Sequence, residues 1–79
     1  MTASLQFLTR EGCHLCEEAL RLLQGVPLEV IDIDNDPALH SEFGERVPVV
    51  RDAATGSVLL EGKITEAQVK RVRRARTDR

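Results

Sequence analysis

Apolar residues along this chain occur in short runs that follow two different periods. Residues 4–8 form a short apolar run of the kind that builds a β-strand. Residues 13–24 instead repeat apolar side chains at i, i+4, i+7 and i+8, the spacing of one helical face, at Leu15, Ala19, Leu22 and Leu23. Gly25 is placed as the C′ residue of this helix, and Pro27 stops it. The pattern therefore predicts a strand followed by an amphipathic helix.

A second strand and a second helix are predicted after residue 27. Residues 28–33 form a β-rich run with the sequence Leu-Glu-Val-Ile-Asp-Ile, which predicts a strand. Asp36 suits an N-cap and Pro37 suits the first helical position, so a short helix is expected over residues 38–43. Gly44 ends this helix.

A β-hairpin is predicted in the second half of the chain. Residues 46–50 return to strand, and residues 52–56 form a turn into a further strand at residues 57–60. Strands joined by so short a loop pair in antiparallel fashion, whereas a strand–helix–strand unit gives parallel strands with a right-handed crossover. The chain therefore predicts one mixed sheet.

The last predicted element is a helix. Gly62 breaks the strand pattern, and Thr65 suits an N-cap for a helix over residues 66–75 that packs through Val69 and Val72. The predicted order is β-α-β-α-β-β-α. The expected fold is an α/β sandwich of one mixed sheet with helices on its faces.

The composition fits one small domain over residues 1–79. The chain is 42% apolar but has only two aromatic residues, Phe7 and Phe43, and no Trp or Tyr. The core is therefore expected to consist of Leu, Val and Ile. A surface that stacks on nucleic-acid bases is not expected, because such surfaces need exposed aromatic rings.

The net charge of −2 hides a basic segment at residues 70–79. This segment holds six Lys or Arg residues against one Asp, whereas the preceding 69 residues hold twelve acids against five bases. The six basic residues are Lys70, Arg71, Arg73, Arg74, Arg76 and Arg79. Such a segment could contact nucleic acid, anionic lipid or an acidic partner. Basic side chains near a helix C-terminus also complement the helix dipole without any partner, and both interpretations stay open.

Both cysteines of the chain lie between the first predicted strand and the first predicted helix. Cys13 and Cys16 are three residues apart at the helix start, where unpaired N–H groups and the helix dipole stabilise a thiolate. Free cysteine has a pKa of about 8.5, which such a site can lower to roughly 3.5–7.5. Cys16 lies one turn further on, within reach of Cys13 for a disulfide. This arrangement predicts a thiol–disulfide redox site.

The surroundings expected for these thiols bear on their role. No run of the sequence resembles a signal peptide or a membrane-spanning helix, so we expect a cytoplasmic protein without a membrane partner. Thiols are kept reduced in the cytoplasm, which favours a catalytic or metal-binding pair over a lasting structural disulfide. A zinc site would need four ligands, and the chain offers Cys13, Cys16, His14 and His40. His14 lies between the cysteines, a poor geometry for placing all three on one ion.

Three segments of the chain together match one known family. Residues 9–16 are Thr-Arg-Glu-Gly-Cys-His-Leu-Cys, residues 46–48 are Arg-Val-Pro, and residues 61–62 are Glu-Gly. They resemble, in turn, the Thr-Lys-x-x-Cys-Pro-Tyr-Cys pattern, the Thr-Val-Pro segment and the Gly-Gly turn of glutaredoxins, a branch of the thioredoxin superfamily. More narrowly, the chain is similar to short bacterial glutaredoxin-like proteins with a Cys-His-Leu-Cys-Glu motif. The resemblance implies a thioredoxin-like fold with a four-stranded mixed sheet and three helices.

The resemblance also implies roles for residues of the site. Cys13 is the expected nucleophile, and the more buried Cys16 is the expected resolving thiol. Pro48 is expected to follow a cis peptide bond and to face the sulfurs, which leaves the backbone of Val47 free to bind an extended substrate. The alternative for Pro48 is a trans proline at the start of a strand.

Four further residues are candidates for substrate binding: Arg10, His14, Arg46 and Gly62. Arg10 matches the basic residue that approaches a glutathione carboxylate in glutaredoxins, and Arg46 could receive a carboxylate of the substrate or of glutathione. His14, if protonated, could stabilise the Cys13 thiolate. For each of the three charged residues, simple solvation is the alternative interpretation.

The expected substrates are protein or small-molecule disulfides, with glutathione as a candidate co-substrate and no other cofactor. His14, Leu15, Arg46 and Glu61 depart from the family pattern, and several of these positions hold glutathione in true glutaredoxins. Dithiol chemistry therefore carries over better than glutathione as the electron donor. A monomer without a nucleic-acid partner is expected. The alternative is a binding module without redox turnover, with zinc or an iron–sulfur cluster on the cysteines or an acidic partner on the basic segment.

Overall fold

The computed structural model describes residues 4–77, and its elements follow the predicted order. The elements are β1 (Leu5–Thr9), α1 (His14–Leu22), β2 (Glu29–Asp32), the 3₁₀ helix η1 (Ile33–Asn35), α2 (Pro37–Phe43), β3 (Val49–Asp52), β4 (Val58–Glu61) and α3 (Glu66–Thr77). The short η1 was not predicted. It begins where the Asp32 carboxylate accepts a hydrogen bond from the backbone N–H of Asp34, at 2.9 Å.

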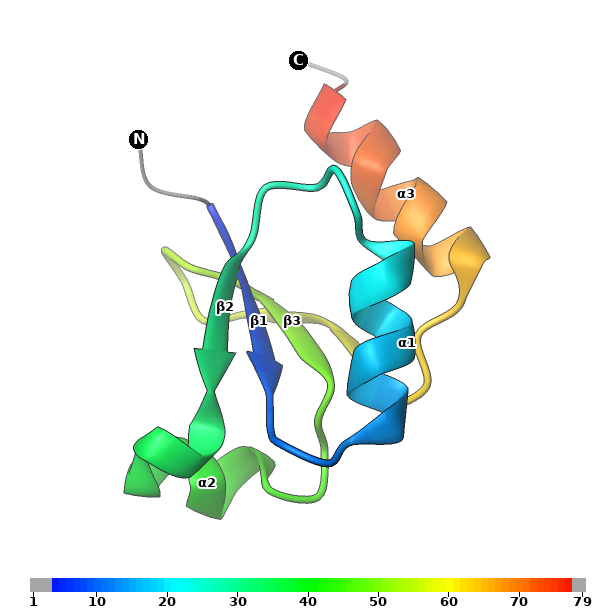
Figure 1. The fold of residues 1–79 in the computed structure, drawn as a ribbon. Helices are drawn as coiled ribbons and strands as arrows, with labels where there is room; N and C mark the ends of the chain where they lie inside the picture. The colour runs from blue at the N-terminus through cyan, green and yellow to red at the C-terminus, as the bar shows by residue number, and fades with distance from the viewer. Residues whose placement is uncertain (1–3, 78–79) are drawn as a thin grey trace.

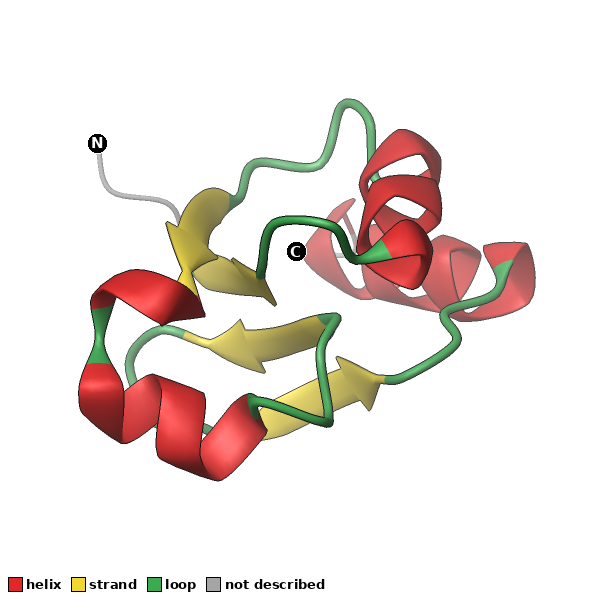
Figure 2. Ribbon diagram, turned by 60° about the horizontal axis from the view of Figure 1, so that its bottom comes forward, coloured by secondary structure: helices red, strands yellow, loops and turns green. Residues whose placement is uncertain are grey.

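The four strands form one mixed sheet in the order β2-β1-β3-β4. β1 and β2 are parallel, with α1 as their crossover, whereas β3 is antiparallel to both β1 and β4. The helices α1 and α3 lie side by side, and α2 lies near the carboxyl ends of β1 and β2 (Figure 1). Figure 2 shows the sheet between these two groups of helices. The predicted mixed sheet with three α-helices is confirmed.

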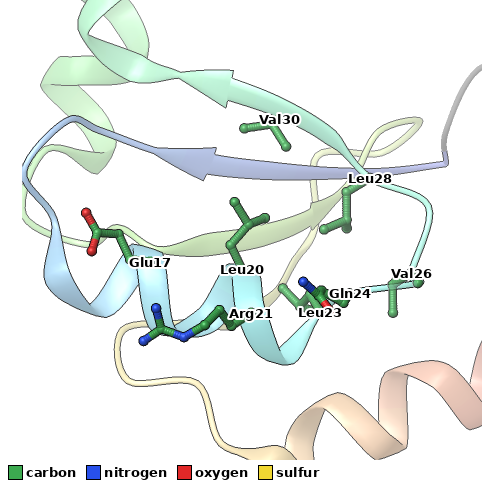
Figure 3. A pocket seen from close by; sticks show the side chains of 9 residues that line it. Glu17, Leu20, Arg21, Leu23, Gln24, Val26, Leu28 and Val30 are labelled. Carbon is green, nitrogen blue, oxygen red and sulfur yellow. The ribbon is translucent and has the colours of Figure 1, made fainter.

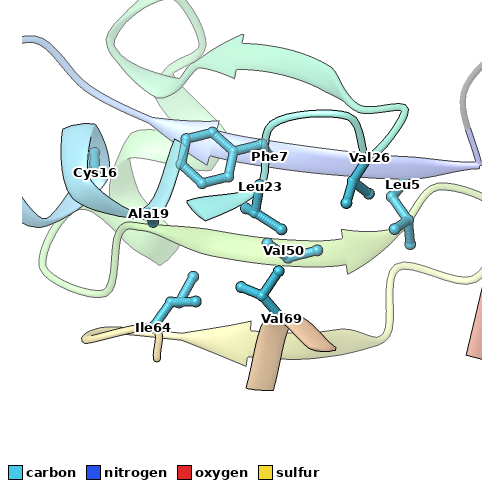
Figure 4. Packing of buried hydrophobic residues seen from close by; sticks show 9 residues of the cluster. All are labelled: Leu5, Phe7, Cys16, Ala19, Leu23, Val26, Val50, Ile64 and Val69. Atoms are coloured by element: carbon cyan, nitrogen blue, oxygen red, sulfur yellow. The ribbon is translucent and has the colours of Figure 1, made fainter. Parts of the chain in front are cut away.

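The sheet buries side chains on both faces, in two clusters. Leu5 and Phe7 belong to the cluster under α1 and α3, whereas Leu8 belongs to the cluster under α2, as the alternation along a strand requires. The larger cluster comprises Leu5, Phe7, Cys16, Ala19, Leu23, Val26, Val50, Ile64 and Val69 (Figure 4). The smaller comprises Leu8, Ile33, Phe43 and Val49. The core consists mainly of Leu, Val and Ile, as expected, but each cluster also includes one phenylalanine.

The predicted apolar face of α1 also needs correction. The spacing predicts Leu15 on that face, but Leu15 is 39% exposed, whereas Cys16 is only 2% exposed. The buried face consists of Cys16, Ala19 and Leu23, with Leu22 at its edge. The apolar pattern alone did not include Cys16, whose burial the family resemblance implied, and cysteine packs as a small hydrophobic residue.

The helix starts follow the predicted caps. The Asp36 carboxylate accepts hydrogen bonds from the backbone N–H groups of Ala38 and Leu39, and Pro37 is the first residue of α2. The Thr65 hydroxyl accepts from the N–H of Gln68, whose side chain accepts from the N–H of Thr65. This reciprocal pair is a capping box at the start of α3.

Several element boundaries differ from the prediction by one to three residues, among them those of α1, β3 and α3. The last helical residue of α1 is Leu22, and Gly25 lies two residues beyond the C-cap Leu23, with φ of +87°. β3 begins at Val49, three residues later than predicted. The preceding Pro48 has no N–H and therefore cannot donate a hydrogen bond to a neighbouring strand. α3 extends to Thr77.

Within residues 4–77, no helix combines the length and the apolar content that crossing a membrane requires.

Candidate active site

The two cysteines lie where β1 passes into α1. Cys13 is the N-cap of α1, and its sulfur accepts a hydrogen bond from the backbone N–H of Cys16 at 3.1 Å. Gly12 turns the chain before it with a φ of +80°, a conformation that glycine adopts readily. A disulfide joins Cys13 to Cys16, and their Cα atoms are 5.2 Å apart. The Cys13 sulfur therefore lies among the unpaired donors at the start of a helix.

The two sulfurs differ in burial. Cys16 belongs to the larger core cluster and is 2% exposed. Cys13 is half-buried and packs against the edge of the same cluster. Solvent and an incoming molecule can therefore reach Cys13 more easily than Cys16.

The loop before β3 packs beside the cysteines. Val47 contacts both core clusters, including the one that contains Cys16 and has Cys13 at its edge. The Val47–Pro48 peptide bond is cis, and Pro48 is fully buried. The carbonyl of Pro48 accepts a hydrogen bond from the N–H of Gly62 at 2.9 Å, so Gly62 adjoins the same loop.

Arg46 is held by a carboxylate and an aromatic ring. Its Nη2 donates to Oε1 of Glu61 at 2.9 Å, and its Nε donates to Oε2 at 3.2 Å. Its Cζ lies 4.7 Å from the centroid of the Phe43 ring. The side-chain hydrogen bond lowers the pKa of Glu61 and raises the pKa of Arg46. The carboxylate that Arg46 binds in this structure thus comes from the chain itself.

Arg10 links the end of β1 to α2. Its Nη1 donates to the carbonyl of Gly44 at 3.1 Å, and its Nη2 lies 3.4 Å from Oδ1 of Asp34. The same Nη2 lies 3.4 Å from Nε2 of His40, which is itself 3.5 Å from Asp34. The sequence pattern contained no signal for this cluster, because η1 and α2 must fold before these residues meet.

His14 lies on the exposed face of α1. Its side chain is 84% exposed, and its Nε2 is 3.7 Å from the Glu18 carboxylate, one helical turn along. The contact is an ion pair only when the imidazole is protonated. Within residues 4–77, no three His, Cys, Asp or Glu side chains are grouped so that they could hold a metal ion.

Two of the hollows on the surface formed by residues 4–77 bear on the site. One of about 510 Å³ lies over α2 and the loop that follows it, with Arg10 and Arg46 among its lining residues. The other, of about 400 Å³, lies between α1 and β2 and is lined mainly by apolar side chains such as Leu20, Leu28 and Val30 (Figure 3). Of these two, the first reaches Arg46 in the loop that packs beside the cysteines, and the second does not.

Part of the basic segment serves the fold. A guanidinium nitrogen of Arg73, on α3, donates to the carbonyl of Leu22 at 3.0 Å and to that of Gln24 at 2.6 Å. These carbonyls lie at the C-terminal end of α1, where a cation complements the helix dipole. The side chains of Arg76 and Arg79, which the predicted segment includes, lie outside the described part of the chain.

These features define the class of protein. The mixed sheet, the helices on its two faces and the cysteine pair at the start of α1 form a thioredoxin-like α/β fold. The chain belongs to the family described as Glutaredoxin-like domain (DUF836), which matches residues 4–73. The family resemblance found in the sequence is thereby confirmed.

Similar structures have been solved. The X-ray structure of the structural genomics target protein XcR50 from X. campestris is 34% identical, with a TM-score of 0.72 over 90% of this chain and 96% of that one. The solution structure of protein Ne2328 from Nitrosomonas europaea is also 34% identical, with a TM-score of 0.66 over 92% of both chains. A malarial protein that is 14% identical, with a TM-score of 0.58, shares the fold alone. No protein with a curated description matches the chain.

Proposed function

We propose that this protein is a thiol–disulfide oxidoreductase that works through the Cys13–Cys16 pair. The observation that carries the proposal is the position of the Cys13 sulfur. It lies at the N-cap of α1 and accepts a hydrogen bond from the backbone N–H of Cys16. In the reduced protein this position favours the thiolate, because unpaired N–H groups and the helix dipole stabilise a negative charge there. Membership of the glutaredoxin-like family supports the same chemistry.

The proposed reaction has two exchange steps. The Cys13 thiolate attacks one sulfur of a substrate disulfide, the substrate S–S bond breaks, and the other substrate sulfur leaves as a thiolate that takes up a proton. Cys16 then loses its proton and attacks the Cys13 sulfur in this mixed disulfide, which releases the second substrate thiol. Two electrons pass from the cysteine pair to the substrate, and the pair becomes the Cys13–Cys16 disulfide.

Burial and neighbours support the two roles. The half-buried Cys13 can meet a substrate, whereas Cys16, inside the core cluster, can attack only a sulfur already bound at residue 13. We place the backbone of the substrate against Val47, in the loop that packs beside the cysteines. Protein or small-molecule disulfides are the proposed substrates, and the protein is expected to act as a monomer in the cytoplasm.

A redox titration of the purified full chain tests this proposal. The protein is equilibrated at graded ratios of reduced to oxidised glutathione, its thiols are trapped by alkylation, and the species are counted by mass. The expected result is a single two-electron transition between the dithiol and the Cys13–Cys16 disulfide. Cys13→Ser should abolish it, and Cys16→Ser should stop at a mixed disulfide on Cys13. Thiols that stay reduced at every ratio would refute the proposal, and metal analysis of the same sample tests the metal-binding alternative.

A further inference from the structure

We propose that Glu61 is a specificity-determining residue: by occupying Arg46, it disfavours disulfides that carry carboxylates relative to uncharged ones. The inference rests on the proposed exchange reaction at Cys13. It concerns the recognition of the substrate, in particular whether glutathione disulfide is a good partner for this site. It also reverses the expectation that Arg46 is available to a carboxylate of the substrate.

Arg46 and Glu61 border the approach to the cysteines. Arg46 directly precedes the Val47–Pro48 segment, and Glu61 directly precedes Gly62, whose N–H binds the carbonyl of Pro48 at 2.9 Å. β3 begins at Val49, which pairs with Leu8 near the end of β1, so the loop that leads into β3 adjoins the connection from β1 to α1, which contains Cys13 (Figure 1). A glutathionyl group is a tripeptide that spans at most about 10 Å. Its carboxylates could therefore contact only side chains that border the site.

The chain itself already occupies two cationic groups beside the site, Arg46 and Arg10. Glu61 takes the Nε–Nη2 edge of Arg46 in a bidentate pair, so two of the donors of this guanidinium already bind a carboxylate. The ring of Phe43 covers the Arg46 guanidinium at 4.7 Å. Arg10 donates to the carbonyl of Gly44 and lies 3.4 Å from Asp34. At Arg46, an incoming carboxylate would have to displace that of Glu61 and would be repelled by its charge.

Two probe disulfides separate recognition from thiol reactivity. Each half of glutathione disulfide carries a net negative charge at neutral pH, whereas hydroxyethyl disulfide is uncharged. The Cys13 thiolate attacks both, one S–S bond breaks in each case, and one substrate thiolate leaves. The rate constant with glutathione disulfide divided by that with hydroxyethyl disulfide therefore cancels any change in the reactivity of Cys13.

The experiment measures this ratio for the reduced full chain at low ionic strength, by acid quenching, alkylation and mass analysis. Glu61→Gln frees Arg46 and is expected to raise the ratio about three- to fivefold, a modest effect because the pair is exposed. Arg46→Gln leaves the Glu61 charge uncompensated and should lower the ratio. Both changes should shrink as salt is added, because salt screens exposed charges.

Glu45→Gln is the matched control. Glu45 is exposed, follows the same helix and lines the same hollow as Arg46, so its removal deletes one negative charge without breaking the pair. The ratio for this variant should stay within about twofold of that for the original chain. A ratio for Glu61→Gln that matches the Glu45→Gln control would overturn the inference. If the original chain reacts with neither disulfide, the proposed function fails, and the inference fails with it.

Discussion

Replacement of Cys13 by Ala should destabilise the reduced fold more than its replacement by Ser. In the structure, the side chain of residue 13 caps α1 by accepting the N–H of Cys16 at 3.1 Å. Serine keeps an acceptor at nearly the same place, whereas alanine leaves the N–H without that partner. Because neither variant can form the Cys13–Cys16 disulfide, its contribution cancels in the comparison.

The size of the effect follows from the cap and from what α1 carries. Loss of an N-cap acceptor costs about 1 kcal/mol, within a range of roughly 0.5–2 kcal/mol. The helix brings Cys16, Ala19 and Leu23 into the larger core cluster, so a weaker first turn affects the stability of the whole fold. For a domain of this size, about 1 kcal/mol shifts the melting temperature by roughly 4–8 °C. The alanine variant is expected to melt lower by that amount.

Thermal unfolding under reducing conditions, followed by far-ultraviolet circular dichroism, measures this difference. The same Ser and Ala pair at Cys16 is the matched control. Cys16 is buried among apolar side chains, so a hydroxyl there is expected to give no gain over alanine. Equal melting temperatures for the two Cys13 variants would refute the N-cap role, and with it the physical reason given for a stabilised thiolate.

Three further predictions concern α3 and the Arg46–Glu61 pair. Val69→Ala deletes two methyl groups from a fully buried side chain and should cost about 2 kcal/mol in urea unfolding, whereas a negligible cost would contradict the packing of α3 on the core. Arg73→Gln removes the donor to the carbonyls of Leu22 and Gln24 and should lower the free energy of unfolding by about 1 kcal/mol. Arg71 is exposed on the same helix, so Arg71→Gln should change the free energy of unfolding little. Equal losses for the two variants would argue against the capping contact. The hydrogen bond from Arg46 lowers the pKa of Glu61 below its ordinary value of 4.5. The pair therefore stabilises the fold at a pH above 4.5, and this stabilisation is lost as the pH falls through the pKa of Glu61 in the folded protein. The stability deficit of Glu61→Gln, measured by urea unfolding, should therefore be present at neutral pH and fade in acid, and a deficit that does not change with pH would speak against the pair.

Much of the cysteine site could be predicted because its residues are close in the chain. Cys13 and Cys16 follow a strand and open a helix, and a helix start presents unpaired N–H groups wherever it occurs. The Arg46–Glu61 pair could not be predicted in this way. The two residues are fifteen positions apart and meet where β3 pairs with β4 beyond Pro48. The cluster of Arg10 with Asp34 and His40 depends in the same way on how η1 and α2 fold back toward β1.

By itself the sequence determined the local features of this protein. These features depend on hydrogen bonds between residues that are near in the chain. They are the caps at Asp36 and Thr65, the strand and helix periods, and the placement of the thiol pair. Tertiary structure decided the rest. It left Leu15 exposed, because the position of the sheet selects which side of α1 loses contact with water. It also placed Glu61 on Arg46, because only strand pairing brings these two charges together.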